Sequence, residues 1–422
     1  MYRIIAALMA VTSCASIAQA QTATSPPSSA SQPIFTLDRA RTIAGGSSPS
    51  IESAAAGVRS AAAGRTIAGL RPNPEIQVQT ENVAGSGIYR GTQSAETTAT
   101  LALPIELGGK RSARIAVADS RSARAQIDAS IALADLNLRI TQTYISAAAA
   151  ERRVDVARQQ AEIAGNAFKA ARTRVTAGAG APIDQQRADV LRVNAEVGLE
   201  RAVREAAVAR SNLERLVGQP IEGSLDLGWF DRVGGYGPTM PVDPSGTLAL
   251  AAAQADLNTA DAQVRLARSQ RIPDITLSVG ARRLSQTNDK AAVVGIAIPF
   301  PLFNNGAAAV SQARAEQTRA DANRRVAIIE AEQAIASAQA ELANAAATAR
   351  SAGGPGLAAA SEAARIARIG YSQGKFSQLD LLEAERTLAE TRAAFTDALA
   401  AYHDAEARLE RLTAPAPELG ER

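Results

Sequence analysis

The side chains that most often carry catalysis or bind metal are scarce in this sequence. Its 422 residues include one histidine, His403, and one cysteine, Cys14. A metal-ligand cluster of nitrogen and sulfur donors, of the kind that holds zinc and similar metals, cannot be assembled from these two residues. No nucleophile–base pair, phosphate-binding loop or isolated carboxylate dyad stands out either. We therefore expect no enzyme activity, no cofactor and no resident metal.

Three carboxylates have suggestive positions. Asp380 and Glu383 are three residues apart, which places them on one face of a helix, and Asp184 belongs to a similar stretch earlier in the chain. A solvated helix face commonly carries this pattern, so the elements that position the three acids must decide whether they have a further role.

The sequence around these acids is written twice. GAGAPIDQQRADV in the middle of the chain corresponds to GKFSQLDLLEAER near its end, and LERL occurs at 213–216 and again at 409–412. Gly178 and Gly374 are 196 residues apart (374 − 178), and the same spacing separates Asp184 from Asp380 (380 − 184). Strand-end motifs repeat at a spacing of 197, with Pro104 and Gly109 matching Pro301 and Gly306. This near-constant register indicates an internal duplication.

The duplication organises the whole chain. We expect a signal peptide at 1–20, a disordered or extended leader at 21–35, repeats at 36–217 and 246–414, a connector at 218–245 and a tail at 415–422. Each repeat runs helix, strand, strand, long helix, helix. The expected strands are about 75–82, 97–103, 274–281 and 292–299, and the expected long helices about 110–175, 182–217, 307–350 and 357–413. SAGGPGLAA at 351–359 predicts a kink or stacked junction in the second copy.

The N-terminus indicates export. MYRIIAALMAVTSCASIAQA has a basic start, an apolar stretch and a small-residue end, which predicts cleavage after Ala20. Val11–Cys14 also resembles a lipoprotein cleavage site, where Cys14 would become the lipidated first residue; both alternatives stay open. No later apolar run reaches 18 residues, so a transmembrane helix is excluded on length. The exported chain is then either free in the periplasm or crosses a membrane only as strands.

Composition favours long, closely packed helices. The chain is 46% hydrophobic but only 3% aromatic, so its apolar side chains are mostly small or aliphatic. The formal net charge is +3, with Arg and Asp/Glu interleaved along the sequence. Without a basic run or interleaved aromatics, nucleic acid is not an expected partner.

The four expected strands alternate apolar and polar residues and have the length of tilted membrane strands. Two ordinary hairpins of a soluble domain would show the same alternation. Closure separates the two cases, because four strands cannot close a barrel and an open edge in lipid leaves backbone groups unpaired. Two chains would supply eight strands and three would supply twelve. A conduit favours the trimer, since larger barrels leave a channel.

The expected helix over 110–175 is about 100 Å long, at ~1.5 Å per residue. Ile127, Ile131, Ala134, Leu138, Thr141 and Ile145 form one seam along it, and Leu133, Leu136, Ile140 and Tyr144 form a second. A helix with two seams contacts a neighbour on each side, which lets helices close into a ring around a hollow. At its start, Pro104 is expected to end the strand, and Gly108 and Gly109 to turn the backbone into the helix.

Several stretches together resemble the TolC-type outer-membrane efflux proteins, most of all the branch that serves cobalt–zinc–cadmium resistance pumps. These stretches are GLRPNPEIQVQTEN, LPIELGGKRSARIAVA, IPFPLFNNG and YSQGKFSQLDLLEAERTLAETRAAF, and the likeness covers about 36–414. The resemblance implies a homotrimer in which a twelve-stranded barrel, four strands per chain, crosses the outer-membrane lipid above a periplasmic α-helical barrel. It also implies a periplasmic adaptor (membrane fusion) protein and an inner-membrane resistance-nodulation-division pump as partners.

The resemblance assigns roles to the helix–turn–helix joints. Gly178 and Gly374 match tip glycines that adaptors contact, together with Val175, Tyr371 and Lys375; Asp380 and Glu383, with Asp184 in the sister joint, match acids that ring a closed aperture. Three-fold repetition of Asp380 and Glu383 gives six carboxylates in a narrow throat, which attracts cations. Two positions depart from the pattern: Phe376 stands where some relatives have a latching arginine, and Arg187 replaces the acid equivalent to Glu383.

Three functions follow in order of preference. The first is a passive, gated outer-membrane export duct for heavy-metal cations such as cobalt, zinc, cadmium or copper, located in the outer membrane with a large periplasmic part. The second is the same duct serving drug efflux or type I protein secretion. The third is a soluble periplasmic coiled-coil adaptor or scaffold.

Overall fold

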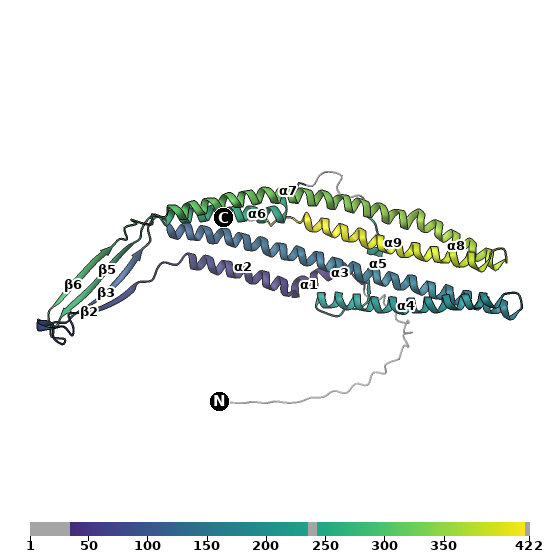
Figure 1. Cartoon of the computed structure of the whole chain (residues 1–422), viewed down its shortest axis with the longest axis horizontal. Helices are drawn as coiled ribbons and strands as arrows, with labels where there is room; N and C mark the ends of the chain where they lie inside the picture. Colours follow the sequence, from purple (N-terminus) through teal and green to yellow (C-terminus); the bar gives the residue numbers. More distant parts are fainter. Residues whose placement is uncertain (1–33, 235–242, 418–422) are drawn as a thin grey trace, which may run out of the picture.

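The structure is a computed structural model that describes residues 34–234 and 243–417. It is long and narrow, with a small sheet at one end, two helical tips at the other and long helices between them (Figure 1). The expected signal peptide, Cys14 and nearly all of the leader lie outside the described residues. A mainly α chain with a β part at one end is the fold class that the sequence predicts, and this prediction is confirmed.

The strands form one antiparallel sheet in the order β2-β3-β5-β6. Their bounds are β2 Glu75–Glu81, β3 Glu96–Ile105, β5 Ile275–Leu284 and β6 Lys290–Ala297. Consecutive pairs are hairpins from the two halves of the chain, and the central pairing of β3 with β5 joins the halves in register from Glu96↔Leu284 to Ile105↔Ile275. Strands β2 and β6 are therefore the two edges, and each has one side without a partner in this chain.

The two faces of the sheet differ in polarity because side chains alternate along each strand. One face is apolar and exposed; it carries Ile76, Val78, Leu101, Leu103, Leu277, Val279, Val294 and Ile296. The other face carries Gln77, Gln79, Thr98, Thr100, Ser278 and Arg282. An apolar face left open to the surroundings marks a surface made for lipid or for another protein.

Pro104 does not end its strand, contrary to the prediction from sequence. Strand β3 continues through Pro104, which pairs with Thr276, to Ile105. The pairing of β2 with β3 already stops at Ala102, so β3 has a free edge on that side at Pro104. Proline is tolerated where a strand has such an unpaired edge.

Long helices make up the rest of the body. The two repeats contribute α1 Leu37–Ser47, α2 Pro49–Ala68, α3 Lys110–Thr176 and α4 Pro182–Val217, then α6 Leu248–Ser269, α7 Ala307–Ser351, α8 Leu357–Ser372 and α9 Gln378–Leu412. The connector adds a short helix, α5 Leu227–Phe230, and a strand, β4 Ser224–Leu225, that pairs in parallel with β1 Ile34–Phe35. Helix α3 contains no proline and many alanines, which is why 67 residues form a single helix.

At the kink or stacked junction predicted for the second copy, the chain stays helical. Residues Ala352–Gly356 form a π-helical segment that includes Pro355 and joins α7 to α8. Gly353 lies against Phe395 of α9, since a Cβ on this glycine would be 2.3 Å from the ring. The wider turn accommodates the proline, and the glycine lets α9 approach closely.

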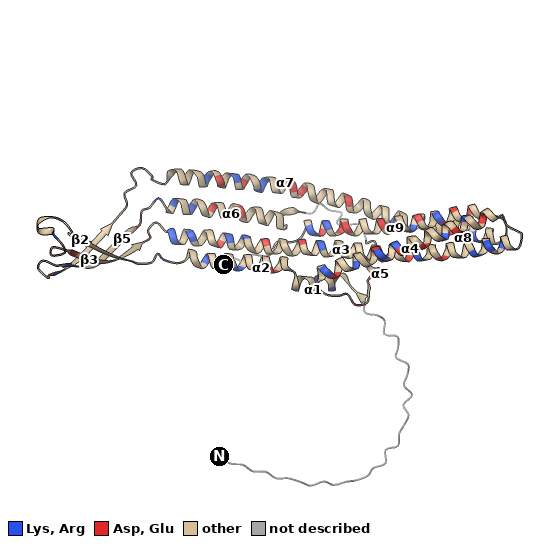
Figure 2. Cartoon of the chain, turned by 60° about the horizontal axis from the view of Figure 1, so that its bottom comes forward, with Lys and Arg blue, Asp and Glu red and all other residues tan. Residues whose placement is uncertain are grey.

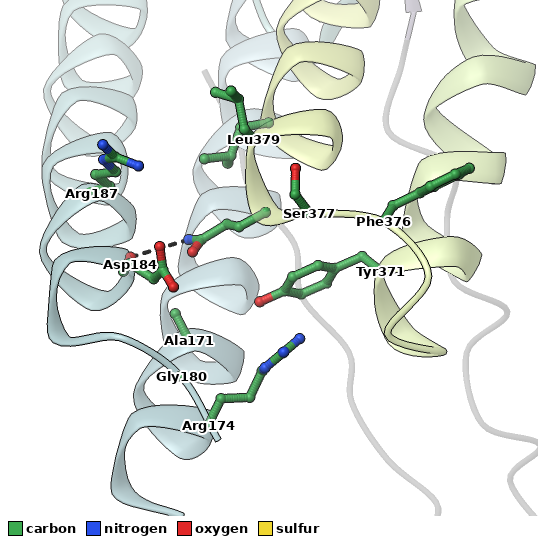
Figure 3. A pocket seen from close by; sticks show the side chains of 11 residues that line it. Ala171, Arg174, Gly180, Asp184, Arg187, Tyr371, Phe376, Ser377 and Leu379 are labelled. Carbon is green, nitrogen blue, oxygen red and sulfur yellow. Dashed lines mark hydrogen bonds between the residues drawn. The ribbon is translucent and has the colours of Figure 1, made fainter. Parts of the chain in front are cut away.

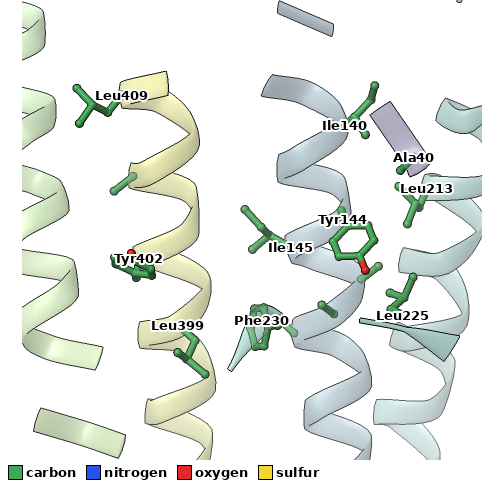
Figure 4. Packing of buried hydrophobic residues seen from close by; sticks show 14 of the residues in the cluster. Ala40, Ile140, Tyr144, Ile145, Leu213, Leu225, Phe230, Leu399, Tyr402 and Leu409 are labelled. Atoms are coloured by element: carbon green, nitrogen blue, oxygen red, sulfur yellow. The ribbon is translucent and has the colours of Figure 1, made fainter. Parts of the chain in front are cut away.

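The main core lies midway along the body, where the connector packs between α3, α4 and α9 (Figure 4). Its largest fully buried side chains are Tyr144 and Phe230. The Tyr144 hydroxyl donates to the carbonyl of Phe35 (2.7 Å) and accepts the N–H of Asp226 (2.8 Å). One phenol thus ties the N-terminal strand and the connector to the middle of α3, and burial raises its pKa to about 12.

Charges of both signs alternate along the helices (Figure 2). Many of them form i,i+3 or i,i+4 pairs on one helix, such as Arg192 with Glu196 and Arg386 with Glu390. Such pairs suit helices that are solvated along most of their length. In the part of the chain that the structure describes, none of the helices combines the length and apolarity needed to span a membrane.

Candidate functional site at the helical tips

The two tips of the helical body have the same backbone turn. Ala179 N–H donates to the carbonyl of Arg174 (2.8 Å), and Lys375 N–H donates to the carbonyl of Gly370 (2.8 Å). One residue earlier, the N–H groups of Gly178 and Gly374 donate to the carbonyls three residues before them. This bonding pattern is a Schellman motif, and it places the same turn at two points 196 residues apart (370 − 174).

Glycine is required at the centre of each turn. Gly178 and Gly374 both have φ of +71°, a left-handed conformation that side chains with a Cβ disfavour. Both glycines are exposed, as is Lys375, whereas Val175 and Tyr371 are half-buried. The residues predicted to contact an adaptor therefore lie at the two tips, where a partner can reach them.

The tips are joined to each other across a cavity of about 260 Å³ (Figure 3). The Arg174 guanidinium of α3 lies over the ring of Tyr371 in α8, 5.4 Å from its centroid. The Gln378 amide of α9 donates to the main-chain carbonyl of Asp184 in α4 (3.2 Å). These two contacts join the α3–α4 pair to the α8–α9 pair at the end of the body opposite the sheet.

Asp380 holds the start of α9. Its Oδ2 accepts the Ser377 N–H (2.8 Å) and the Ser377 hydroxyl (2.7 Å), while Ser377 Oγ accepts the Asp380 N–H (3.3 Å). The two residues form a capping box. The Ser377 side-chain and backbone hydrogen bonds lower the pKa of Asp380, so this exposed carboxylate stays ionised below its ordinary range.

The other two predicted aperture acids lie in different places. Asp184 is half-buried and lines the 260 Å³ cavity. Glu383 is exposed and lines a larger groove, about 1010 Å³, between the α3–α4 and α8–α9 pairs. Asp380 lines neither space. One chain does not bring the three carboxylates to a single point, and any ring of them requires further copies.

Sequence reasoning missed the ties that hold the tips. Arg368 of α8 and the nearly buried Glu385 of α9 form a two-pronged ion pair, with 2.8 Å between Nη2 and Oε2. Gln378 and Arg174 were not singled out either. Their partners are a backbone carbonyl and a ring on other helices, so no local spacing marks them in the sequence.

The strand-to-helix turns carry the other predicted glycines. Gly108, Gly109 and Gly306 all have positive φ, and Gly109 and Gly306 are the N-caps of α3 and α7. A Cβ on Gly108 would lie 2.8 Å from Ile272, so this turn also needs the missing side chain for close packing. Pro301 lies outside regular structure, in the loop between β6 and α7.

Ion pairs fix the same boundary between strands and helices. Lys110 at the start of α3 pairs with Asp274 just before β5 (2.7 Å). Arg114 binds Glu106 through both terminal guanidinium nitrogens, Nη1 and Nη2, and also donates to the carbonyl of Leu70 (3.2 Å). The hydrogen bond from Arg114 lowers the pKa of Glu106, which keeps the pair charged. The angle between sheet and helices is thus held by charge-assisted bonds.

His403 packs inside the body. It is 3% exposed, stacks on Trp229 of the connector (centroids 4.3 Å apart), and its Nε2 donates to the carbonyl of Phe230 (2.9 Å). Nearby, Tyr402 Oη accepts the N–H of Gly234 (3.0 Å). The connector is therefore held against α9 by the contacts that its Trp229 and Phe230 make with His403. In residues 34–234 and 243–417 no group of three His, Cys, Asp or Glu side chains could hold a metal ion.

Comparison with known proteins agrees with this architecture. The family model described as outer membrane efflux protein matches residues 29–219 and 246–414. The cobalt-zinc-cadmium resistance protein CzcC of Cupriavidus metallidurans is 32% identical over 419 residues, covering 94% of each chain. The nickel and cobalt resistance protein CnrC of the same organism is 32% identical over 291 residues, covering 68% of this chain and 69% of its own.

Solved structures share the fold. The outer membrane protein VceC of Vibrio cholerae superposes with a TM-score of 0.72 at 20% identity, over 90% of this chain and 96% of its own. The two stretches that match the family model correspond to the two halves of the molecule, each with its own strand pair and its own tip. The chain belongs to the outer membrane efflux protein family.

Proposed function

We propose that the chain forms the outer-membrane duct of a tripartite export system for divalent heavy-metal cations. The observation that carries the cargo assignment is the full-length similarity to CzcC, whose name records resistance to cobalt, zinc and cadmium. CnrC, named for nickel and cobalt, points to the same class of cargo. The chain belongs to an outer-membrane efflux family, which supports a role in transport and argues against a soluble scaffold.

The sheet supports a trimer. Strands β2 and β6 are unpaired edges of one four-stranded sheet, and an edge left open in lipid is costly. Pairing β6 of one copy with β2 of the next closes twelve strands from three copies. The apolar face then contacts lipid and the polar face lines a channel. Each chain also supplies two helix pairs to a helical tube below.

The tips form the inner entrance of this tube. The Arg174–Tyr371 and Gln378–Asp184 contacts hold the two helix pairs together, and their loss lets the pairs move apart. Asp380, Glu383 and Asp184 of three copies surround the entrance with carboxylates, which concentrates cations there. The duct itself is passive, so selection of the cargo belongs to the pump.

The partners reach the tips. A periplasmic adaptor docks at the exposed turns around Gly178 and Gly374, with Val175, Tyr371 and Lys375 beside them, and connects the duct to a proton-driven inner-membrane pump. The repeated Schellman turn supports this assignment, because each chain offers an adaptor two similar docking positions.

Gene deletion followed by graded exposure to toxicants tests the cargo. Loss of the protein should lower the tolerated concentration of cobalt, zinc, cadmium or nickel severalfold and leave tolerance of organic toxicants unchanged. Re-expression of the wild-type chain restores growth and serves as the control. Sensitivity to organic compounds alone would reassign the duct to drug efflux, and sensitivity to neither class would contradict the proposal.

A further inference from the structure

Six charged residues lie in the four strands: Glu75, Glu81, Glu96, Arg282, Arg283 and Lys290. The register separates them by face. Glu81 pairs with Glu96, and Arg282 pairs with Thr98, so these side chains share the polar face with Glu75. Arg283 pairs with Thr97 and Lys290 on the opposite, apolar face. The polar face therefore carries three carboxylates and one guanidinium.

Arg282 of β5 is held in place by side chains of β3 and β2. Its Nη1 donates to Glu96 Oε2 (2.9 Å), its Nε donates to Thr98 Oγ1 (3.0 Å), and its Nη2 lies 3.7 Å from Glu81 Oε2. The second oxygens of the acids are also occupied: Glu96 accepts from Asn82 (3.1 Å) and Glu81 from Gln79 (3.0 Å). The guanidinium thus sits between two carboxylates that come from β2 and β3.

This network lies at the end of the sheet farthest from the helices, two residues before β5 ends at Leu284 (Figure 1). In the proposed trimer the polar face lines the channel, so the network of three copies surrounds its outer end. On the channel-facing side, two carboxylates and one guanidinium give a net charge of −1 per chain, and −3 for three chains, while Arg283 and Lys290 lie at the same level on the lipid-facing side. The outer end is then attractive to cations.

The occupancy of the carboxylates matters for a divalent cargo. Carboxylate oxygens from two adjacent strands are ligands that divalent metal ions bind. A conduit has to attract its ion without retaining it. A guanidinium that hydrogen-bonds Glu96 and forms an ion pair with Glu81 neutralises part of their charge and leaves the channel-facing side negative, so it meets both requirements.

We propose that Arg282 sets the ionic character of the outer end of the duct: its guanidinium occupies the Glu81–Glu96 carboxylate pair, so that divalent cations are attracted there but not held. This inference rests on the proposed trimeric duct for divalent cations. It names Arg282 as a residue that determines how freely such ions leave.

The test uses the full-length protein in planar bilayers, with reversal potentials in a KCl gradient and block by Co²⁺ added to each side in turn. Arg282→Gln should increase the preference for K⁺ and lower the half-blocking Co²⁺ concentration at least about five-fold, because two neighbouring carboxylates lose their only cationic partner on this face. Arg282→Lys keeps the charge and should retain the wild-type reversal potential. Arg282→Gln with Glu96→Gln leaves one acid and should return the Co²⁺ block to the wild-type level.

Arg283→Gln is the matched control, since it removes the same charge one residue away on the apolar face and should leave both readouts unchanged. Identical behaviour of wild type, Arg282→Gln and Arg283→Gln channels would overturn the proposal. If Arg282→Gln does not assemble, Glu96→Gln decides, because it must weaken the K⁺ preference for the proposal to stand. Wild-type protein that never conducts would overturn the duct itself.

Discussion

The ring of Phe376 lies directly against Gly370: a Cβ on this glycine would be 2.2 Å from Cδ2 of the ring. The equivalent positions in the other tip are Arg174 and Gly180, where a Cβ on Gly180 would lie 3.3 Å from Cβ of Arg174. The large side chain and the glycine have exchanged places between the two tips. Each turn therefore has room for one large side chain, supplied from opposite sides of the turn.

Gly370→Ala should loosen the α8–α9 tip, because the methyl group and the Phe376 ring need the same space. The expected cost is about 1–3 kcal/mol, the usual range for overpacking, seen as faster hydrogen exchange over residues 368–380. Gly370→Ala with Phe376→Ala should recover most of the protection. Gly198→Ala is the control, because nothing lies near Gly198 of α4 and the helix gains up to about 1 kcal/mol. Equal protection in wild type and Gly370→Ala would contradict this packing.

Removing the two ties between the tips should widen the entrance. Tyr371→Ala abolishes the contact with Arg174, and Gln378→Ala abolishes the bond to the Asp184 carbonyl. Each tie is worth about 1 kcal/mol, so the double variant is expected to raise single-channel conductance more than either single change. Arg172→Ala, an exposed residue of the same tip, should conduct like wild type. Channels of unchanged conductance would exclude these contacts as the restraint on the entrance.

The sequence predicts much of the fold because its signals are local or periodic. Alternation marks the four strands, the proline-free run of alanine and leucine marks α3, and Gly178 and Gly374 mark the turns. Whether Pro104 ends β3 could not be predicted from a local signal, because it depends on where β2 stops pairing. The π-helical conformation of residues 352–356 could not be predicted either, because Gly353 packs against Phe395, which is distant in the sequence.

The candidate site is predicted less completely, for a related reason. The acids and turn glycines stand out by type and repeat spacing, but the ties between tips join a side chain to a ring or a backbone carbonyl of another helix. Aligning the two repeats with a shift of 196 residues shows that Gly370 corresponds to Arg174 and Phe376 to Gly180. The sequence does not show that the two residues of each tip lie against each other, which only the interatomic distances reveal.

Ser377→Ala should make the start of α9 less protected at neutral pH and less sensitive to acid. The pKa of Asp380 is lower in the folded chain than in the unfolded one, so the stabilisation is present above pH 3.8 and is lost as the pH falls through the lower folded value. Hydrogen-exchange protection of residues 378–382, corrected for intrinsic rates, should fall about five-fold at pH 7 in the variant. The difference from wild type should shrink towards pH 3. Glu383→Gln, one turn further along, should follow wild type, and a pH-independent difference would argue against a charged cap.

The phenol of Tyr144 gives the clearest link between burial and pH. Its pKa is about 12 in the folded chain and 10.0 ordinarily, so the unfolded chain loses this proton first as the pH rises. The stabilisation is complete below pH 10 and declines between pH 10 and 12. Tyr144→Phe should remove this part of the alkaline decline in melting temperature, measured in detergent from pH 8 to 12.

The same variant should be less stable at every pH below 10. Removing the hydroxyl leaves the Phe35 carbonyl and the Asp226 N–H without their shared partner, at a cost of about 1–3 kcal/mol. Tyr89→Phe is the matched control, because Tyr89 is exposed in the loop between β2 and β3. If both variants melted like wild type at pH 8, the tie from α3 to the connector would contribute nothing to stability. If Tyr144→Phe melted at a lower temperature at pH 8 but kept the full wild-type decline in melting temperature between pH 10 and 12, a group other than Tyr144 would cause that decline.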